Sequence, residues 1–125
     1  MTDLAHAPAG HFDLEAFRSV AHREIEACPL VPVGVCMNPS CSRHFVPRRA
    51  WQTYCSDGCR RVDEAEMRRV GQRAAPALLA WRLGKYETRD PALRDLSRAG
   101  RRYIGALQTE WLASRRLRAM KAGRP

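Results

Sequence analysis

The stretch CMNPSCSRHFVPRRAWQTYCSDGC, residues 36–59, decides the fold of this chain. Its four cysteines form two pairs, Cys36-x4-Cys41 and Cys55-x3-Cys59, with thirteen residues between the pairs. Four thiolates at short paired spacings match a structural zinc site, which takes four protein ligands in a tetrahedron and leaves no position open for a substrate. We therefore predict one structural Zn²⁺ held by Cys36, Cys41, Cys55 and Cys59.

The chain has five cysteines, and residues 1–10 lack the basic and then apolar pattern of a secretory signal. An odd cysteine count without an export signal favours metal ligation in a reducing compartment over disulfides. The fifth cysteine, Cys28, is predicted to be a small buried hydrophobic residue at the end of the first helix. For His44, between the cysteine pairs, exposure to solvent or a hydrogen bond is favoured over ligation.

The composition is that of a globular protein, with 45% hydrophobic and 28% charged residues among 125. That length allows one domain, or a small metal-stabilised module with helical extensions. No stretch approaches 18 uninterrupted apolar residues, so no membrane span is expected. These properties predict a soluble cytoplasmic protein.

The expected fold class is mainly α with a small zinc-bound β-hairpin. A flexible tail (1–10) precedes an N-terminal helix and linker (11–33), with the helix running from Phe12 to about residue 27. The zinc finger (34–75) contains a hairpin between the cysteine pairs, interrupted by Pro47, and then a helix capped by Ser56. A basic helical region (76–125) completes the chain.

Proline and glycine divide the basic helical region. Pro76 is predicted to open an apolar segment that Gly84 closes. Asp90 caps the next and longest helix, which reaches Met120. Glycines at 100 and 105 indicate either a break, giving two helices over 91–121, or a close helix crossing. The apolar stripe from Leu93 to Leu117 either forms a dimer or packs on the first helix.

A cysteine knuckle, a hairpin and two ligands at the start of a helix are similar to the treble-clef arrangement of zinc fingers. The runs 36–41 and 54–56, with Phe45 between them, resemble CGNR-type fingers and related small bacterial and phage zinc proteins. Here the last ligand is followed by Arg60-Arg61-Val62 rather than Gly-Asn-Arg, and the last spacing is one residue shorter. The Cys-Ser-x-x-Cys ending is also similar to small zinc proteins that inhibit DNA gyrase. These resemblances imply a zinc fold and a function linked to DNA.

The charge distribution points to a polyanionic partner. Residues 1–42 carry a net charge of −3, whereas residues 43–75 carry +4, residues 76–100 carry +2 and residues 101–125 carry +6. A one-sided basic surplus is the electrostatic footprint of nucleic acid binding. The arginines expected to contact phosphate are Arg48, Arg49, Arg60, Arg61, Arg115, Arg116 and Arg118. Phe45, Trp51 and Tyr54 are predicted to cover the metal rather than to stack on bases.

No phosphate-binding loop or nucleophile motif occurs, and a closed four-cysteine site leaves no metal position for chemistry, so we do not expect an enzyme. The predicted function is a zinc-finger DNA-binding or transcription-associated regulator. The alternative is an adaptor or inhibitor whose basic face binds an acidic patch on a protein of the transcription or replication machinery, such as a polymerase or topoisomerase. A finger that serves only as scaffold is the third hypothesis.

Overall fold

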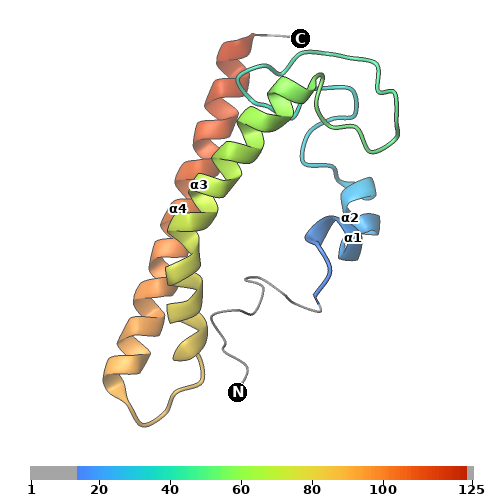
Figure 1. Ribbon diagram of the computed structural model, residues 1–125. Coiled ribbons are helices and arrows are strands. Elements are labelled where there is room, and N and C mark those ends of the chain that lie inside the picture. The colour runs from blue at the N-terminus through green and yellow to red at the C-terminus, as the bar shows by residue number, and fades with distance from the viewer. Residues whose placement is uncertain (1–13, 124–125) are drawn as a thin grey trace, which may run out of the picture. The chain divides into compact units, whose positions relative to one another are not determined.

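The fold is built from helices joined by loops. The computed structural model describes residues 14–123, and the chain runs through α1 (Phe17–Val20), α2 (His22–Ala27), α3 (Asp57–Leu83) and α4 (Pro91–Ala122) (Figure 1). It divides into two compact units between Pro32 and Val33. Within the described residues, no helix combines the length and the hydropathy that crossing a membrane requires. The mainly helical class is confirmed.

The first unit differs from the predicted single helix. Two helices of four and six residues, α1 and α2, meet at Ala21, whose backbone leaves the helical region. The predicted start at Phe12 lies outside the described residues. Neither helix buries a side chain, and Cys28 is exposed at the end of α2, so the prediction of a buried Cys28 is wrong. A helix of this length is stabilised mainly by tertiary packing. Because neither helix buries a side chain, the periodic pattern alone does not give one long helix.

Helix α3 begins after Ser56 and ends before Gly84, as the sequence predicts. It continues through Pro76, where a new segment was predicted to begin. Ser56 caps it by accepting a hydrogen bond from the Cys59 amide, and Gly84 follows its last residue. Proline in a helix interior removes one hydrogen bond and costs about 3 kcal/mol. Pro76 is exposed, and the residues on either side of it pack continuously against α4, which offsets that cost.

Helix α4 is the longest element, as predicted, and it is one helix rather than two. The Asp90 carboxylate caps it by accepting hydrogen bonds from the amides of Ala92 and Leu93, and Pro91 occupies its first turn. It ends at Gly123, whose φ of 62° is the left-handed conformation common after helices. Neither Gly100 nor Gly105 interrupts it.

Helices α3 and α4 lie side by side and antiparallel, joined by the loop 84–90 (Figure 1). The Leu93 to Leu117 stripe therefore faces α3 in part, through residues spaced three and four apart. The least exposed positions of the seam are Val70, Ala74, Ala77 and Trp81 on α3 and Leu93, Ser97, Gly100, Ile104, Leu107 and Trp111 on α4. The Ser97 hydroxyl donates to the Trp81 carbonyl at 2.6 Å. Small residues at the seam bring the two backbones close together.

Gly100→Ala is expected to destabilise the protein. A Cβ at this position would lie 2.5 Å from the Ala77 carbonyl oxygen and 2.8 Å from the Trp81 nitrogen, so the helices must separate. Overpacking of this kind costs about 1 to 3 kcal/mol. Thermal or urea unfolding of the purified variant measures the loss.

Gly105→Ala is the matched control, because no atom lies within 4 Å of its would-be Cβ. Alanine favours a helix interior over glycine by up to about 1 kcal/mol, so this variant is expected to gain stability. Equal effects at the two positions would contradict the close helix crossing at Gly100.

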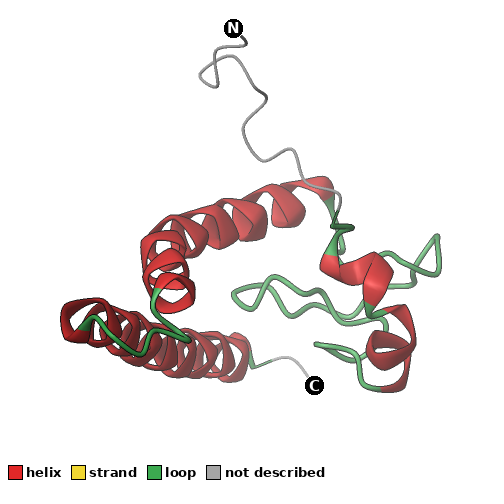
Figure 2. Cartoon of the chain, turned by 90° about the horizontal axis from the view of Figure 1, so that it is seen from below, coloured by secondary structure: helices red, strands yellow, loops and turns green. Residues whose placement is uncertain are grey.

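The predicted β-hairpin between the cysteine pairs is not confirmed. Within residues 14–123 no strand forms (Figure 2), and the one β-bridge pairs Val35 with His44 across the first cysteine pair. Residues 46–54 form a loop organised by Gln52, whose side chain accepts from the Arg48 amide and donates to the Tyr54 carbonyl. Pro47 has no amide hydrogen for a strand ladder, and these side-chain hydrogen bonds take the place of one.

Candidate metal centre

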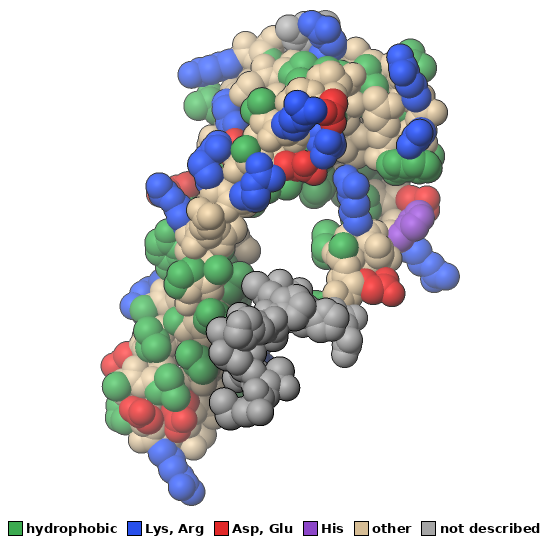
Figure 3. Space-filling model, viewed as in Figure 1, with side chains coloured by type: hydrophobic (Ala, Val, Ile, Leu, Met, Phe, Trp, Pro, Cys, Tyr) green, Lys and Arg blue, Asp and Glu red, His purple; other side chains and the backbone are tan. Residues whose placement is uncertain are grey.

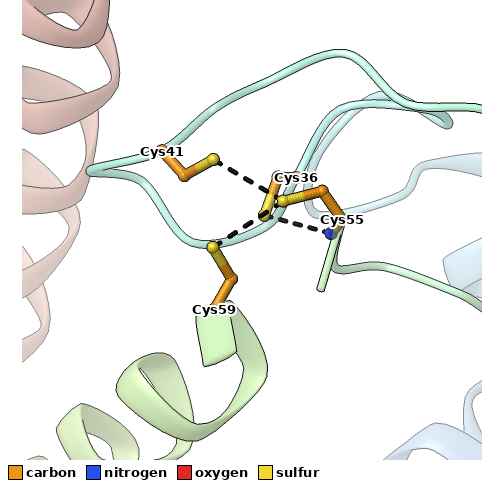
Figure 4. A group of neighbouring side chains, drawn as sticks. All are labelled: Cys36, Cys41, Cys55 and Cys59. Carbon is orange, nitrogen blue, oxygen red and sulfur yellow. Dashed lines mark hydrogen bonds between the residues drawn. The ribbon is translucent and has the colours of Figure 1, made fainter. Parts of the chain in front are cut away.

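The four paired cysteines converge at one point (Figure 4). Cys36 and Cys41 lie on the knuckle that follows Val35, Cys55 ends the loop, and Cys59 lies in the first turn of α3. Their Sγ atoms all lie within 4.8 Å of one another, and none is in a disulfide. The predicted ligand set is therefore brought together, while Cys28 remains outside it.

The sulfur separations fit a tetrahedral metal site. The Cys55 Sγ atom lies 3.7 Å from the Sγ atoms of both Cys41 and Cys59. Four sulfurs at about 2.3 Å from a central Zn²⁺ would be about 3.8 Å apart along each edge of the tetrahedron. The cluster is thus positioned to hold one metal ion through four thiolates.

The knuckle that carries the first pair is fixed by its own hydrogen bonds. The amides of Cys41 and Ser42 donate to the Asn38 carbonyl, and the Asn38 side chain accepts from the Ser40 amide. Ser42 has a φ of 48°, an uncommon conformation for a residue with a side chain, and its hydroxyl donates to the Pro39 carbonyl. These hydrogen bonds shape the turn so that Cys36 and Cys41 point to the same place.

A backbone amide also contacts one of the sulfurs. The Cys55 amide donates to the Cys36 Sγ atom at 3.3 Å, which stabilises negative charge on that sulfur. A second backbone bond, from the Met37 amide to the Thr53 carbonyl, joins the knuckle to the end of the loop. The two halves of the site are thus held together by hydrogen bonds.

The thiols differ in acidity. Burial raises the pKa of Cys36 to about 12 and also raises the pKa of Cys55. At Cys59 burial acts in the same direction, but hydrogen bonds from Asn38 and Ser56 outweigh it and lower the pKa to about 7. Cys36 and Cys55 therefore hold their protons at neutral pH until a metal displaces them, and metal affinity should fall as the pH decreases.

A buried polar network connects the knuckle to both long helices. The Tyr54 hydroxyl donates to Asp63 Oδ2 at 2.6 Å, and Arg115 Nη1 donates to Asp63 Oδ1 at 2.7 Å. The other arm of Arg115 donates to the Met37 carbonyl at 3.0 Å. Asp63 is 1% exposed and accepts from both partners. Burial and the Asp63 hydrogen bond both raise the pKa of Tyr54, so this hydroxyl remains a donor.

The network extends along α4 to a second carboxylate, Glu66. It accepts from Trp111 Nε1 at 2.9 Å, from Arg115 at 2.7 Å and from Arg118 at 2.6 Å. The Arg118 hydrogen bond is the largest cause that lowers the pKa of Glu66 to about 2. Because this pKa is lower in the folded chain, the interactions stabilise the fold above about pH 4.5 and are lost as the pH falls toward 2, by roughly 2 to 3 kcal/mol.

The seven arginines expected to contact phosphate fall into three groups. Arg115 and Arg118 of α4 form ion pairs with Asp63 and Glu66 of α3. Arg60 and Arg61 are exposed but share the carboxylate of Asp57. The third group is exposed and forms no ion pair with any residue from 14 to 123: Arg48, Arg49 and Arg116.

The aromatic residues near the cysteines also divide into buried and exposed ones. Tyr54 is buried and Phe45 half-buried, consistent with the prediction that they cover the metal site. Trp51 is 67% exposed, so the prediction of a packing role is wrong for this residue. The Arg49 guanidinium lies 5.6 Å from the centre of its ring. His44 is exposed and belongs to no metal cluster among the described residues.

Sequence reasoning missed Asp63 and Glu66 and assigned Arg115 and Arg118 to another role. One signal was present: two acids three residues apart on α3 and two arginines three residues apart on α4 can pair across two antiparallel helices. Recognising it required knowing that residues 63 and 115 face each other.

Fold and site together define a small protein with an α-helical hairpin and, at one end of it, a four-cysteine centre positioned for a metal ion. The chain matches no protein-family model, no curated protein and no solved structure.

Proposed function

We propose that the four cysteines hold one structural Zn²⁺ and that the chain is a non-enzymatic, DNA-binding regulator associated with transcription. The order of elements supports a zinc finger of treble-clef type: a knuckle with two ligands, a loop, and two more ligands at the start of a helix. Four thiolates in a tetrahedron suit Zn²⁺, whose role in such a site is to stabilise the fold.

The proposal that the protein binds DNA rests mainly on the side chains exposed on the loop between the cysteine pairs. Arg48 and Arg49 are exposed there, without an ion-pair partner in the described part of the chain, and Arg49 stacks on the exposed ring of Trp51. Arginine next to an open aromatic face is a common arrangement for binding phosphate and stacking on a base. The metal would anchor both ends of this loop, through Cys41 and Cys55.

The surface around this loop adds positive charge. Lys and Arg side chains surround the metal end of the molecule in Figure 3. Exposed residues of the same unit in this region include Arg43, Arg68, Arg69, Arg73, Arg116 and Lys121. A surface of this kind attracts a polyanion without needing base-specific contacts.

Binding to a random-sequence DNA duplex at about 50 and 200 mM salt tests the proposal. We expect affinity to fall steeply between these concentrations, because each neutralised phosphate releases counterions. The double variant Arg48→Gln/Arg49→Gln should bind more weakly and reduce the slope of log affinity against log salt by about 2.

The matched control is Arg89→Gln/Arg98→Gln, which removes the same charge from the far end of the helical hairpin. It should bind DNA more tightly than the loop variant does. Equal losses for the two variants would mean that net charge alone, and not the loop, determines binding. No binding at the lower salt concentration would instead favour the second hypothesis, an acidic protein partner.

A further inference from the structure

Helix α4 carries a second apolar stripe that does not face α3. Its members repeat at spacings of four and three, about 100° around the helix from the seam. They are Ala92, Leu96, Ala99, Tyr103, Ala106, Ala113, Leu117 and Met120, and all are exposed. Leu96, Tyr103, Leu117 and Met120 are 47%, 45%, 51% and 76% exposed. A heptad stripe of this length is the pattern of a helix that packs on another helix.

The stripe is complementary to itself in the antiparallel direction. If two copies of α4 cross with Ala106 at the twofold axis, Leu96 of one copy lies within one residue of Leu117 of the other. In the same register Ala99 lies opposite Ala113, and Ala92 lies opposite Met120. Ala106 then meets Ala106 at the axis, where the two backbones are closest, and Leu96 and Leu117 meet toward each end.

The charges on α4 match the same register. Glu110 is the one acidic residue among the last 25 of the chain and interrupts the stripe. Antiparallel pairing places it level with Arg102 and next to Tyr103 of the other copy. Asp95, which is exposed, comes to lie near Arg116 of the other copy. A parallel pairing would instead place Glu110 opposite Glu110.

Few large apolar side chains are buried within one chain, and the stripe on α4 remains exposed to solvent. In the described part of the helical hairpin, Ile104 is the one large apolar side chain that is fully buried. An exposed apolar stripe along a helix is a candidate surface for contact with another protein. The exposed basic residues Arg98 and Arg101 lie on the opposite flank of α4, so pairing along the stripe leaves them accessible.

From these observations we infer that the protein forms a twofold-symmetric homodimer through the Ala92–Met120 stripe of α4, with the two copies of α4 antiparallel. The contact is isologous, since each residue pair occurs twice. It packs two helical hairpins into a four-helix assembly. Because each metal centre lies at the C-terminal end of its α4, the dimer carries the two centres at opposite ends.

Sedimentation or light scattering of the metal-loaded protein tests this inference. We expect a mass twice the 14.2 kDa of one chain. Ala106→Arg opposes two guanidinium groups at the twofold axis and should weaken the dimer roughly tenfold or more in Kd, with helix content and metal content unchanged. The control Ala119→Arg lies about 140° around the helix from Ala106 and should remain dimeric.

Cysteine cross-linking in a Cys28→Ser background tests the orientation. A mixture of Ala99→Cys and Ala113→Cys proteins should cross-link as a heterodimer far more than either protein alone. Cross-linking within each single variant would indicate parallel helices and overturn the antiparallel register. A monomeric wild-type chain, or an Ala106→Arg variant that remains fully dimeric, would overturn the interface itself.

Discussion

Cys59→Ser is expected to abolish metal binding and to unfold the knuckle and loop, residues 33–56. Serine oxygen is a poor ligand for a thiolate site, and three remaining cysteines cannot close the tetrahedron. For structural zinc sites the free energy of metal binding, about 10 to 16 kcal/mol, is also free energy of folding. Among the described residues, two of the three buried hydrophobic side chains, Cys36 and Tyr54, belong to this end of the molecule.

Metal analysis and near-ultraviolet circular dichroism measure the two expected losses. Cys28→Ser is the matched control, because Cys28 is exposed and lies outside the cluster. It should retain both the metal and the near-ultraviolet signal of the wild-type chain. A Cys59→Ser variant that keeps a full complement of metal, or that folds as the wild type does without metal, would contradict the four-cysteine site.

Asp63→Ala is expected to lower the free energy of unfolding by about 3 to 5 kcal/mol. Asp63 is the most deeply buried charged residue described and pairs with Arg115 through both carboxylate oxygens. Its removal leaves the Arg115 guanidinium without its main partner in a half-buried place and the Tyr54 hydroxyl without an acceptor. Arg115 keeps its hydrogen bond to Glu66, but removing one carboxylate from a buried network is still far more costly than losing a surface pair.

The next residue along α3 provides the control. Glu64 pairs with Arg60 on the surface, and both side chains are more than 40% exposed. Glu64→Ala should therefore change the free energy of unfolding by less than about 1 kcal/mol. Urea unfolding of both variants gives the comparison, and an Asp63→Ala variant as stable as Glu64→Ala would show that the network contributes little.

Local signals in the sequence were sufficient for the ligand set and for the helix ends. The cysteine spacings predicted the cluster, Ser56 and Asp90 predicted the starts of α3 and α4, and Gly84 the end of α3. The glycine at position 100 left a break or a close crossing open, and the structure has the close crossing. Each of these features depends on neighbouring residues or on a spacing, which a single sequence displays directly.

The errors arose where tertiary contacts override local preference. Pro76 argued for a break, but the continuous packing of α3 on α4 keeps the helix intact. Aromatic and β-branched residues between the cysteine pairs argued for a hairpin, but the side chain of Gln52 organises a loop there instead. Arg115 lies in a run of basic residues that is typical of an exposed surface, yet it pairs with the buried Asp63. Only the packing of α4 on α3 brings these two residues together.

The measurement that tests the central claim most directly is the metal content of the purified wild-type chain, combined with X-ray absorption at the metal edge. We expect one Zn²⁺ per chain, with four sulfur neighbours at about 2.3 Å, and unfolding of the knuckle and loop when a chelator removes it. A folded chain that contains no metal, or a metal with oxygen or nitrogen neighbours, would contradict it.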